Sequence, residues 1–223
     1  MDYRVEAGLW VALSLGLYGL WTFYLARLWE ARKPQKLWAD ALEELACGLY
    51  FLGIPALALV RGTILPRFMG FTHLDWIGSA GPSIRAALFF ALLLLAIRFI
   101  RGRAEARNPG VSSVPDNLKQ ALYFQMHWAF YRAFAIPLLG LQAGVLAGWA
   151  ISLVEGVLFS LGERLKGASF GSEALWTPAA HSALFRLGFA AVATGVVFLF
   201  SRNFFYCLAL HWLLSEMMGR LEV

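Results

Sequence analysis

Charged side chains are scarce in this sequence: they make up 15% of its 223 residues, against about 25% in an average soluble domain. A soluble fold needs more charge than this to cover its surface. Apolar residues make up 60% of the chain, and the mean hydropathy is +0.63. These values exclude a soluble globular domain, a disordered chain and a nucleic-acid-binding module. They indicate an integral membrane protein.

Cysteine is nearly absent as well. The two cysteines, Cys47 and Cys207, both lie in apolar stretches, so we expect two small buried residues and no disulfide scaffold. Several motifs of soluble enzymes are also missing: the chain has no H-E-x-x-H, C-x-x-C, P-loop or G-x-S-x-G sequence. Chemistry, if there is any, must come from residues that lie apart in the sequence.

Long apolar stretches recur along the chain. A helix needs about 20 mostly apolar residues to cross a bilayer, and seven stretches approach this length. The sequence therefore predicts an all-α, polytopic transmembrane helix bundle of about seven spans. The stretches lie at roughly 8–28, 42–60, 86–100, 118–139, 141–161, 179–200 and 203–219.

Two longer connections divide these spans. Residues 61–85 mix Gly, Pro and aromatic side chains, and we expect a loop on the membrane surface. Residues 101–117 are basic and then rich in Pro and Ser, which is typical of a linker. One membrane domain is therefore predicted, with a three-span front half at 1–107 and a four-span back half at 108–223.

Lysine and arginine are unevenly shared between the two sides of the predicted bundle. Alternate connections hold 12 of the 19 basic residues on one side and 5 on the other, and the last 2 lie within spans. Basic loops stay on the cytoplasmic side. The bias predicts a multi-pass protein of the plasma (inner) membrane with an external N-terminus and a cytoplasmic C-terminus.

Ionisable side chains within the predicted spans all belong to the back half. At membrane depth such groups cost about 2.5–3.5 kcal/mol each on insertion, and they often mark functional sites. They also pair with one another between helices, so we expect Glu155 to form an ion pair with one of the two arginines if no site exists. The set comprises His127, Arg132, Glu155, His181, Arg186, His211 and Glu216.

Small residues follow a different pattern at the start of the predicted span 141–161. Gly140, Gly144 and Gly148 recur at intervals of four, which places them on one face of a helix. Such a face lets two helix backbones approach closely. We expect this pattern to serve packing.

The back half resembles a known family. Residues 155–160 read EGVLFS, a later span opens at His181, and residues 198–217 read FLFSRNFFYCLALHWLLSEM. This order resembles that of the three motifs of the CPBP intramembrane metalloproteases, a family related to the CAAX prenyl endopeptidases. The three motifs are E-E-x-x-x-R, F-x-x-x-H and H-x-x-x-N. By position, Glu155, His181 and His211 match the glutamate and the two histidines.

The resemblance implies a zinc site that activates water for peptide hydrolysis. Glu155, His181 and His211 would then be the catalytic residues and the metal ligands, with His127 as a fourth candidate ligand.

The motifs are incomplete, and the residues that differ are those that the chemistry needs most. The second glutamate and the arginine of the first motif are replaced by Gly156 and Ser160, the aromatic residue before His181 by Thr177, and the final asparagine by Ser215. Residues 125–133, QMHWAFYRA, offer a rival first motif that ends in Arg132 but has no glutamate.

Four functions fit these observations. The favoured one is a non-catalytic CPBP relative whose helices bind another membrane protein, a lipid or a membrane-embedded peptide. The alternatives are an active intramembrane endopeptidase, a haem- or chlorophyll-type pigment binder that uses intramembrane histidines, and a transporter whose buried arginines counter an anion. None of the four involves nucleic acid.

Overall fold

The computed structural model describes residues 3–21, 36–101, 114–167 and 178–219. These segments contain helices and turns but no strand, which confirms the all-α class. The helices are α1 (Tyr3–Leu20), α3 (Lys36–Gly48), the π-helical turn η2 (Leu49–Gly53), α4 (Ile54–Val60), α5 (Pro66–Met69), α6 (Trp76–Arg101), α7 (Val114–Leu139), α8 (Leu141–Gly167), α9 (Pro178–Ser201) and α10 (Phe204–Gly219).

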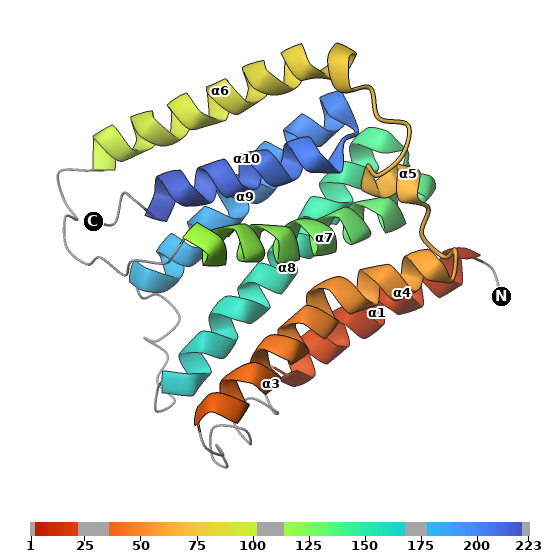
Figure 1. Cartoon of the computed structure of the whole chain (residues 1–223), viewed down its shortest axis with the longest axis vertical. Coiled ribbons are helices and arrows are strands. Elements are labelled where there is room, and N and C mark those ends of the chain that lie inside the picture. The colour runs from red at the N-terminus through yellow and green to blue at the C-terminus, as the bar shows by residue number, and fades with distance from the viewer. Residues whose placement is uncertain (1–2, 22–35, 102–113, 168–177, 220–223) are drawn as a thin grey trace.

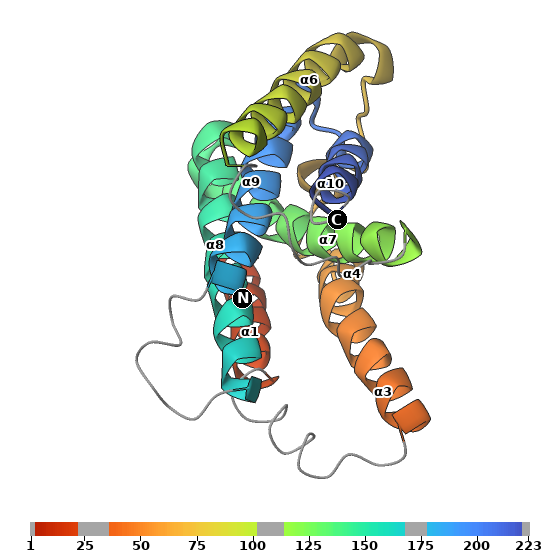
Figure 2. The same ribbon diagram turned by 90° about the vertical axis from the view of Figure 1, so that its left-hand side faces the viewer.

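Helix α7 lies at the centre of the bundle (Figures 1 and 2). It packs against α8 and α10, and it also contacts α1, η2, α4 and α5. Helix α6 lies at one side of the molecule against α9, and α3–η2–α4 lies at the opposite side (Figure 1). Side chains of α7 therefore contact helices from both the front half and the back half of the sequence.

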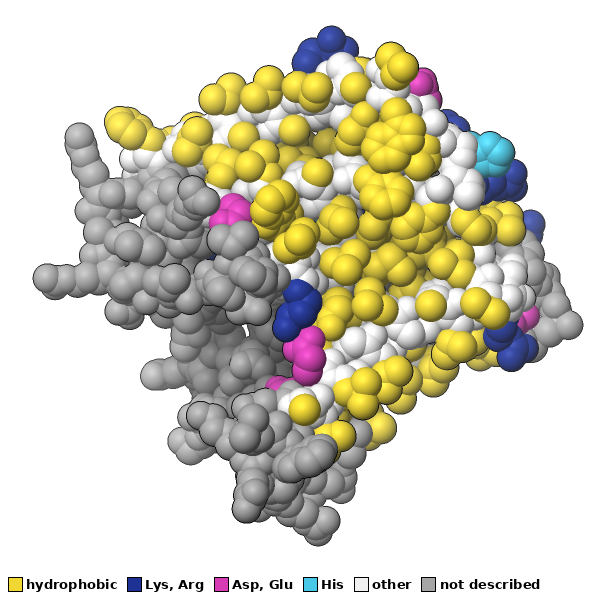
Figure 3. Space-filling model, viewed as in Figure 1, with side chains coloured by type: hydrophobic (Ala, Val, Ile, Leu, Met, Phe, Trp, Pro, Cys, Tyr) yellow, Lys and Arg dark blue, Asp and Glu magenta, His cyan; other side chains and the backbone are white. Residues whose placement is uncertain are grey.

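Some of the described helices are able to cross a membrane. Three segments are long and apolar enough: Ala41–Val60, Trp76–Ile97 and Leu141–Leu158. Phe185–Ser201 and Phe204–Met218 are apolar but shorter. Large apolar side chains cover much of the face shown in Figure 3, as expected of a surface that meets lipid. Seven spans with a fixed orientation stay a prediction.

Helix α6 begins ten residues before the predicted span 86–100. The prediction of a surface loop over 61–85 was therefore wrong for residues 76–85. The side chain of Asp75 accepts a hydrogen bond from the backbone N–H of Gly78 at 2.8 Å, which satisfies a free donor at the start of the helix. The later Pro82 lies inside the helix. An Asp cap thus begins a helix within a stretch whose glycine and proline content suggested a loop.

The predicted span 42–60 forms one rod from α3, η2 and α4 (Figure 1). Its π-helical turn, Leu49–Gly53, ends just before Pro55, which lies in the first turn of α4. Proline has no backbone N–H and disturbs the preceding α-helical hydrogen bonds, so a wider turn before it is a natural accommodation. The turn carries Tyr50 and Phe51 to the face of α7.

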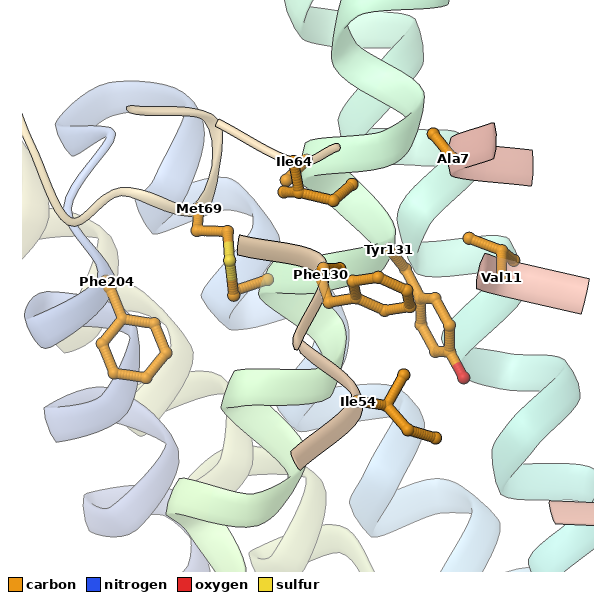
Figure 4. Packing of buried hydrophobic residues seen from close by; sticks show 11 residues of the cluster. Ala7, Val11, Ile54, Ile64, Met69, Phe130, Tyr131 and Phe204 are labelled. Carbon is orange, nitrogen blue, oxygen red and sulfur yellow. The ribbon is translucent and has the colours of Figure 1, made fainter. Parts of the chain in front are cut away.

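The front part of the core joins helices that are far apart in the sequence. Phe130 and Tyr131 of α7 are fully buried at 0% exposure and lie among side chains of α1, α4, α5 and α10 (Figure 4). The cluster consists of Ala7, Val11, Ile54, Ala58, Ile64, Met69, Ala129, Phe130, Tyr131, Ala133 and Phe204.

A polar contact outside this core ties the start of α1 to the turn after α4. The carboxylate of Glu6 accepts a hydrogen bond from Thr63 Oγ1 at 2.9 Å and lies 3.4 Å from Nε of Arg61. The Thr63 hydrogen bond, together with the Arg61 charge, lowers the pKa of Glu6 below its ordinary value. This contact helps to fix α1, which carries Ser14 to the site described below.

Close packing between α7 and α8 confirms the predicted role of the small-residue pattern. Gly140 joins the two helices with a φ of 81°, a conformation that favours glycine. A Cβ atom at Gly148 would lie 2.8 Å from the Cα and the backbone N of Arg132, and one at Gly144 would collide with the backbone of Ile136. The backbones approach so closely because both positions lack side chains.

We expect Gly148→Ala to lower the free energy of unfolding by about 1–3 kcal/mol, because the added methyl group overpacks a rigid backbone contact. Gly81→Ala is the matched control, since a Cβ there meets nothing within 4 Å and alanine favours a helix. Thermal unfolding in detergent measures both variants. Equal melting temperatures for the two would contradict the close contact.

Candidate functional site

A cluster of polar side chains, buried apart from the half-buried Tyr50, lies where α1, η2, α7 and α8 meet. Its centre is His127 of α7, which is fully buried. His127 Nε2 lies 2.7 Å from Ser14 Oγ, and the same hydroxyl lies 3.2 Å from the phenol oxygens of Tyr50 and of Tyr131. Glu155 of α8 completes the cluster, with Oε1 2.9 Å from the Tyr50 hydroxyl and 3.8 Å from His127 Nε2.

The partners of His127 define its tautomer. Nδ1 lies 3.3 Å from the backbone oxygen of Phe51, which can only accept, so we assign the ring proton to Nδ1. Nε2 is then an acceptor for the Ser14 hydroxyl. Both ring nitrogens are engaged by protein atoms, so His127 would have to lose one of these contacts to bind a metal.

Glu155 is 1% exposed and depends on the cluster for its hydrogen bonds. Oε1 accepts from Tyr50, whereas Oε2 has no hydrogen-bond partner among the described residues. No ion pair joins Glu155 to Arg132 in the described segments, so the structure does not contain the predicted pairing of these two residues. The Arg132 guanidinium instead lies over the Phe198 ring at 4.5 Å.

His211 of α10 belongs to a different set of contacts. Its Nδ1 accepts a hydrogen bond from Gln125 Nε2 at 3.2 Å. Its ring stacks on Trp128, with the centroids 4.9 Å apart and the planes 5° from parallel. Phe124 also lies beside it, at a centroid distance of 6.3 Å. Among the described residues, the hydrogen-bond and ring contacts of His211 are therefore with an amide and two aromatic rings.

The two sets occupy different faces of α7. His127 and Tyr131 are four residues apart and share one face, whereas Gln125, Trp128 and Arg132 are spaced by three and four on another. At about 100° per residue, the two faces diverge by roughly a third of a turn. Glu155 therefore contacts one face of α7 while His211 contacts the other.

The third predicted site residue, His181, lies in the first turn of α9, and its side chain is outside the described part of the structure. Within the described part, no group of three His, Cys, Asp or Glu side chains is placed to hold a metal ion. The convergence of Glu155, His181 and His211 on zinc stays a prediction.

Sequence reasoning missed several members of both sets. Ser14 and Tyr50 come from the front half, where no ionisable residue suggested a site. Gln125 and Trp128, which lie in the rival motif, were assigned no role of their own. A usable signal was present in Tyr131, which follows His127 by one helical turn. Hydroxyl groups in apolar stretches are otherwise too common to single out.

The Ser14–His127 pair has the spacing of a nucleophile and its base. Both side chains are 0% exposed, however, so a substrate does not reach them in this arrangement. What the cluster does provide is a continuous set of hydroxyl, imidazole and carboxyl groups that holds α1, η2 and α8 onto α7. Such sets also conduct protons in membrane proteins.

In comparisons with known proteins, no family model, no curated sequence and no solved structure matches this chain.

We expect Tyr50→Phe to lower the free energy of unfolding by about 1–3 kcal/mol, because Oε1 of the buried Glu155 loses its hydrogen bond. Tyr206→Phe is the control: it removes a hydroxyl that donates to the Trp76 backbone oxygen at 2.7 Å on the exposed surface. Denaturant unfolding in detergent compares the two. If Tyr206→Phe destabilises as much as Tyr50→Phe, the buried cluster does not hold the helices together.

Proposed function

We propose that this chain is a multi-pass plasma-membrane protein with a CPBP-like helical bundle that does not cleave peptides and that binds a membrane partner or a membrane-embedded peptide. The supporting observation is the surroundings of His211. Zinc requires thiolate, imidazole or carboxylate ligands and a separate base. In the described structure the hydrogen-bond and ring contacts of His211 are with Gln125, Trp128 and Phe124, and none of these side chains supplies either function.

The same contacts favour residues 125–133 over residues 155–160 as the match to the first motif. In E-E-x-x-x-R the two glutamates stand five and four residues before the arginine, and before Arg132 these positions are His127 and Trp128. Trp128 stacks on His211, the residue that matches the third motif. A first motif at this position thus brings two motifs together and has lost both of its carboxylates.

The binding role is supported by an apolar recess between α7, α8 and α9. It is lined by Phe124, Trp128, Leu153, Leu187 and Ala191, together with Ser152 and Gly156. The recess is small, with a volume of about 10 Å³, so an apolar segment of another membrane protein or a hydrophobic peptide would pack over its apolar lining. The orientation, with the N-terminus outside and the C-terminus in the cytoplasm, rests on the basic residues.

The catalytic half of the proposal is tested by zinc content and by cleavage of membrane-embedded peptides in proteoliposomes. We expect the wild type, Glu155→Gln and His211→Ala to contain no stoichiometric zinc and to show the same background cleavage. His73→Ala, at an exposed loop histidine, controls for loss of an imidazole. Cleavage by the wild type that both site variants lose, and His73→Ala keeps, would establish the peptidase instead.

The binding half is tested by photo-cross-linking in native membranes. A photoreactive side chain at Leu153, in the recess, is expected to give a discrete protein or peptide adduct. The same group at Leu92 of α6, which is 64% exposed, is expected to give lipid adducts alone. Lipid adducts alone at both positions would count against a partner in the recess.

A further inference from the structure

Arg132 is a charged residue without a charged partner in the described structure. Its side chain is 3% exposed, and its Nε and Nη2 atoms have no hydrogen-bond partner among the described residues. The Phe198 ring lies 4.5 Å from the guanidinium carbon and offers a cation–π contact, and the buried thiol of Cys207 also lies near the guanidinium. A buried and uncompensated charge costs several kcal/mol, so a counter-charge is needed here.

A second unpartnered donor lies beside it. The indole Nε1 of Trp149 on α8 is buried and has no hydrogen-bond partner in the described segments. Arg132 and Trp149 line the same small cavity between α7, α8 and α9, together with Trp128, Ser152, Ala191 and Gly195. The two residues that carry these unpartnered nitrogens, on two different helices, therefore line one cavity.

The lining of the cavity is mostly apolar and offers little acceptor capacity. The hydroxyl hydrogen of Ser152 is used by the backbone oxygen of Gly148 at 2.8 Å. The cavity has a volume of about 10 Å³, which suits a single small occupant. A water molecule accepts two hydrogen bonds, needs acceptors for its own hydrogens and leaves the guanidinium charge in place. An anion has no hydrogens of its own to place, can accept hydrogen bonds from these nitrogens and neutralises the charge.

We propose that this cavity is a binding site for a monovalent inorganic anion of about the size of water, such as chloride, held by Arg132 and Trp149. The absent side chain at Gly148 makes the site possible, because a Cβ atom there would lie 2.7 Å from Cγ of Arg132. The bound ion would join α7 to α8. This site does not depend on the proposed loss of peptidase activity.

Thermal unfolding of the full chain in detergent, in sodium chloride or sodium gluconate at equal ionic strength, tests the site. An ion that binds only the folded protein should raise the melting temperature by about 3–6 °C for each tenfold increase in chloride above its dissociation constant. Gluconate is too large for the cavity and should give no such increase. Equal curves in the two salts would overturn the proposal.

Variants assign the effect to the cavity. Arg132→Met keeps the length and apolar stem of the side chain and should abolish the chloride dependence. Arg85→Met, at an exposed arginine of α6, should keep it. Trp149→Phe removes one donor and should weaken chloride binding severalfold. If Arg132→Met does not fold, the Trp149→Phe comparison decides, with broadening of the ³⁵Cl NMR signal as a direct measure of bound chloride. Unchanged binding in Trp149→Phe would overturn the site.

Discussion

The structure depends on one constraint: polar side chains of α7 lie inside an apolar bundle and must find their partners on other helices. In hydrocarbon no water compensates for a missing hydrogen bond. His127 meets this requirement through Ser14 and the Phe51 backbone. Gln125 meets it in part, because Nε2 donates to His211 whereas Oε1 has no hydrogen-bond partner among the described residues. Each contact fixes the rotation of α7 and the position of a neighbouring helix. The polar contacts thus specify one arrangement of the helices, whereas apolar packing alone would allow the helices to slide past one another.

This constraint connects the two predicted halves of the chain. Residues 1–107 contribute Ser14 and Tyr50 to the surroundings of His127 and Glu155, although the ionisable residues within spans were all expected in the back half. The front helices are therefore part of the buried site and not a separate anchor. The π-helical turn has a direct part in this arrangement, because it carries both Tyr50 and the backbone oxygen that orients His127.

The sequence predicted the features that depend on composition and spacing along one helix. Apolar stretches located the long helices. Glycines four residues apart indicated a close approach to a neighbouring helix, and the structure shows that this neighbour is α7. It failed where a single side chain decides, as with the Asp75 cap that starts α6 early. Which residue faces Glu155 depends on the rotation of three helices at once, and no pattern within one helix encodes that. For the same reason Tyr50 was missed and Arg132 was considered as a partner.

Glu155 and Arg132 are the buried charged residues of the described structure that sequence alone would most readily pair, yet they lie on different sides of α7. The carboxylate is next to Tyr50 and His127, and the guanidinium is next to Phe198 and a small cavity. A salt bridge between them would need α7 to rotate by roughly a third of a turn. That rotation would break the Gln125–His211 and Ser14–His127 contacts together. The separation is therefore maintained by hydrogen bonds on both faces, and each charge must be compensated within its own surroundings.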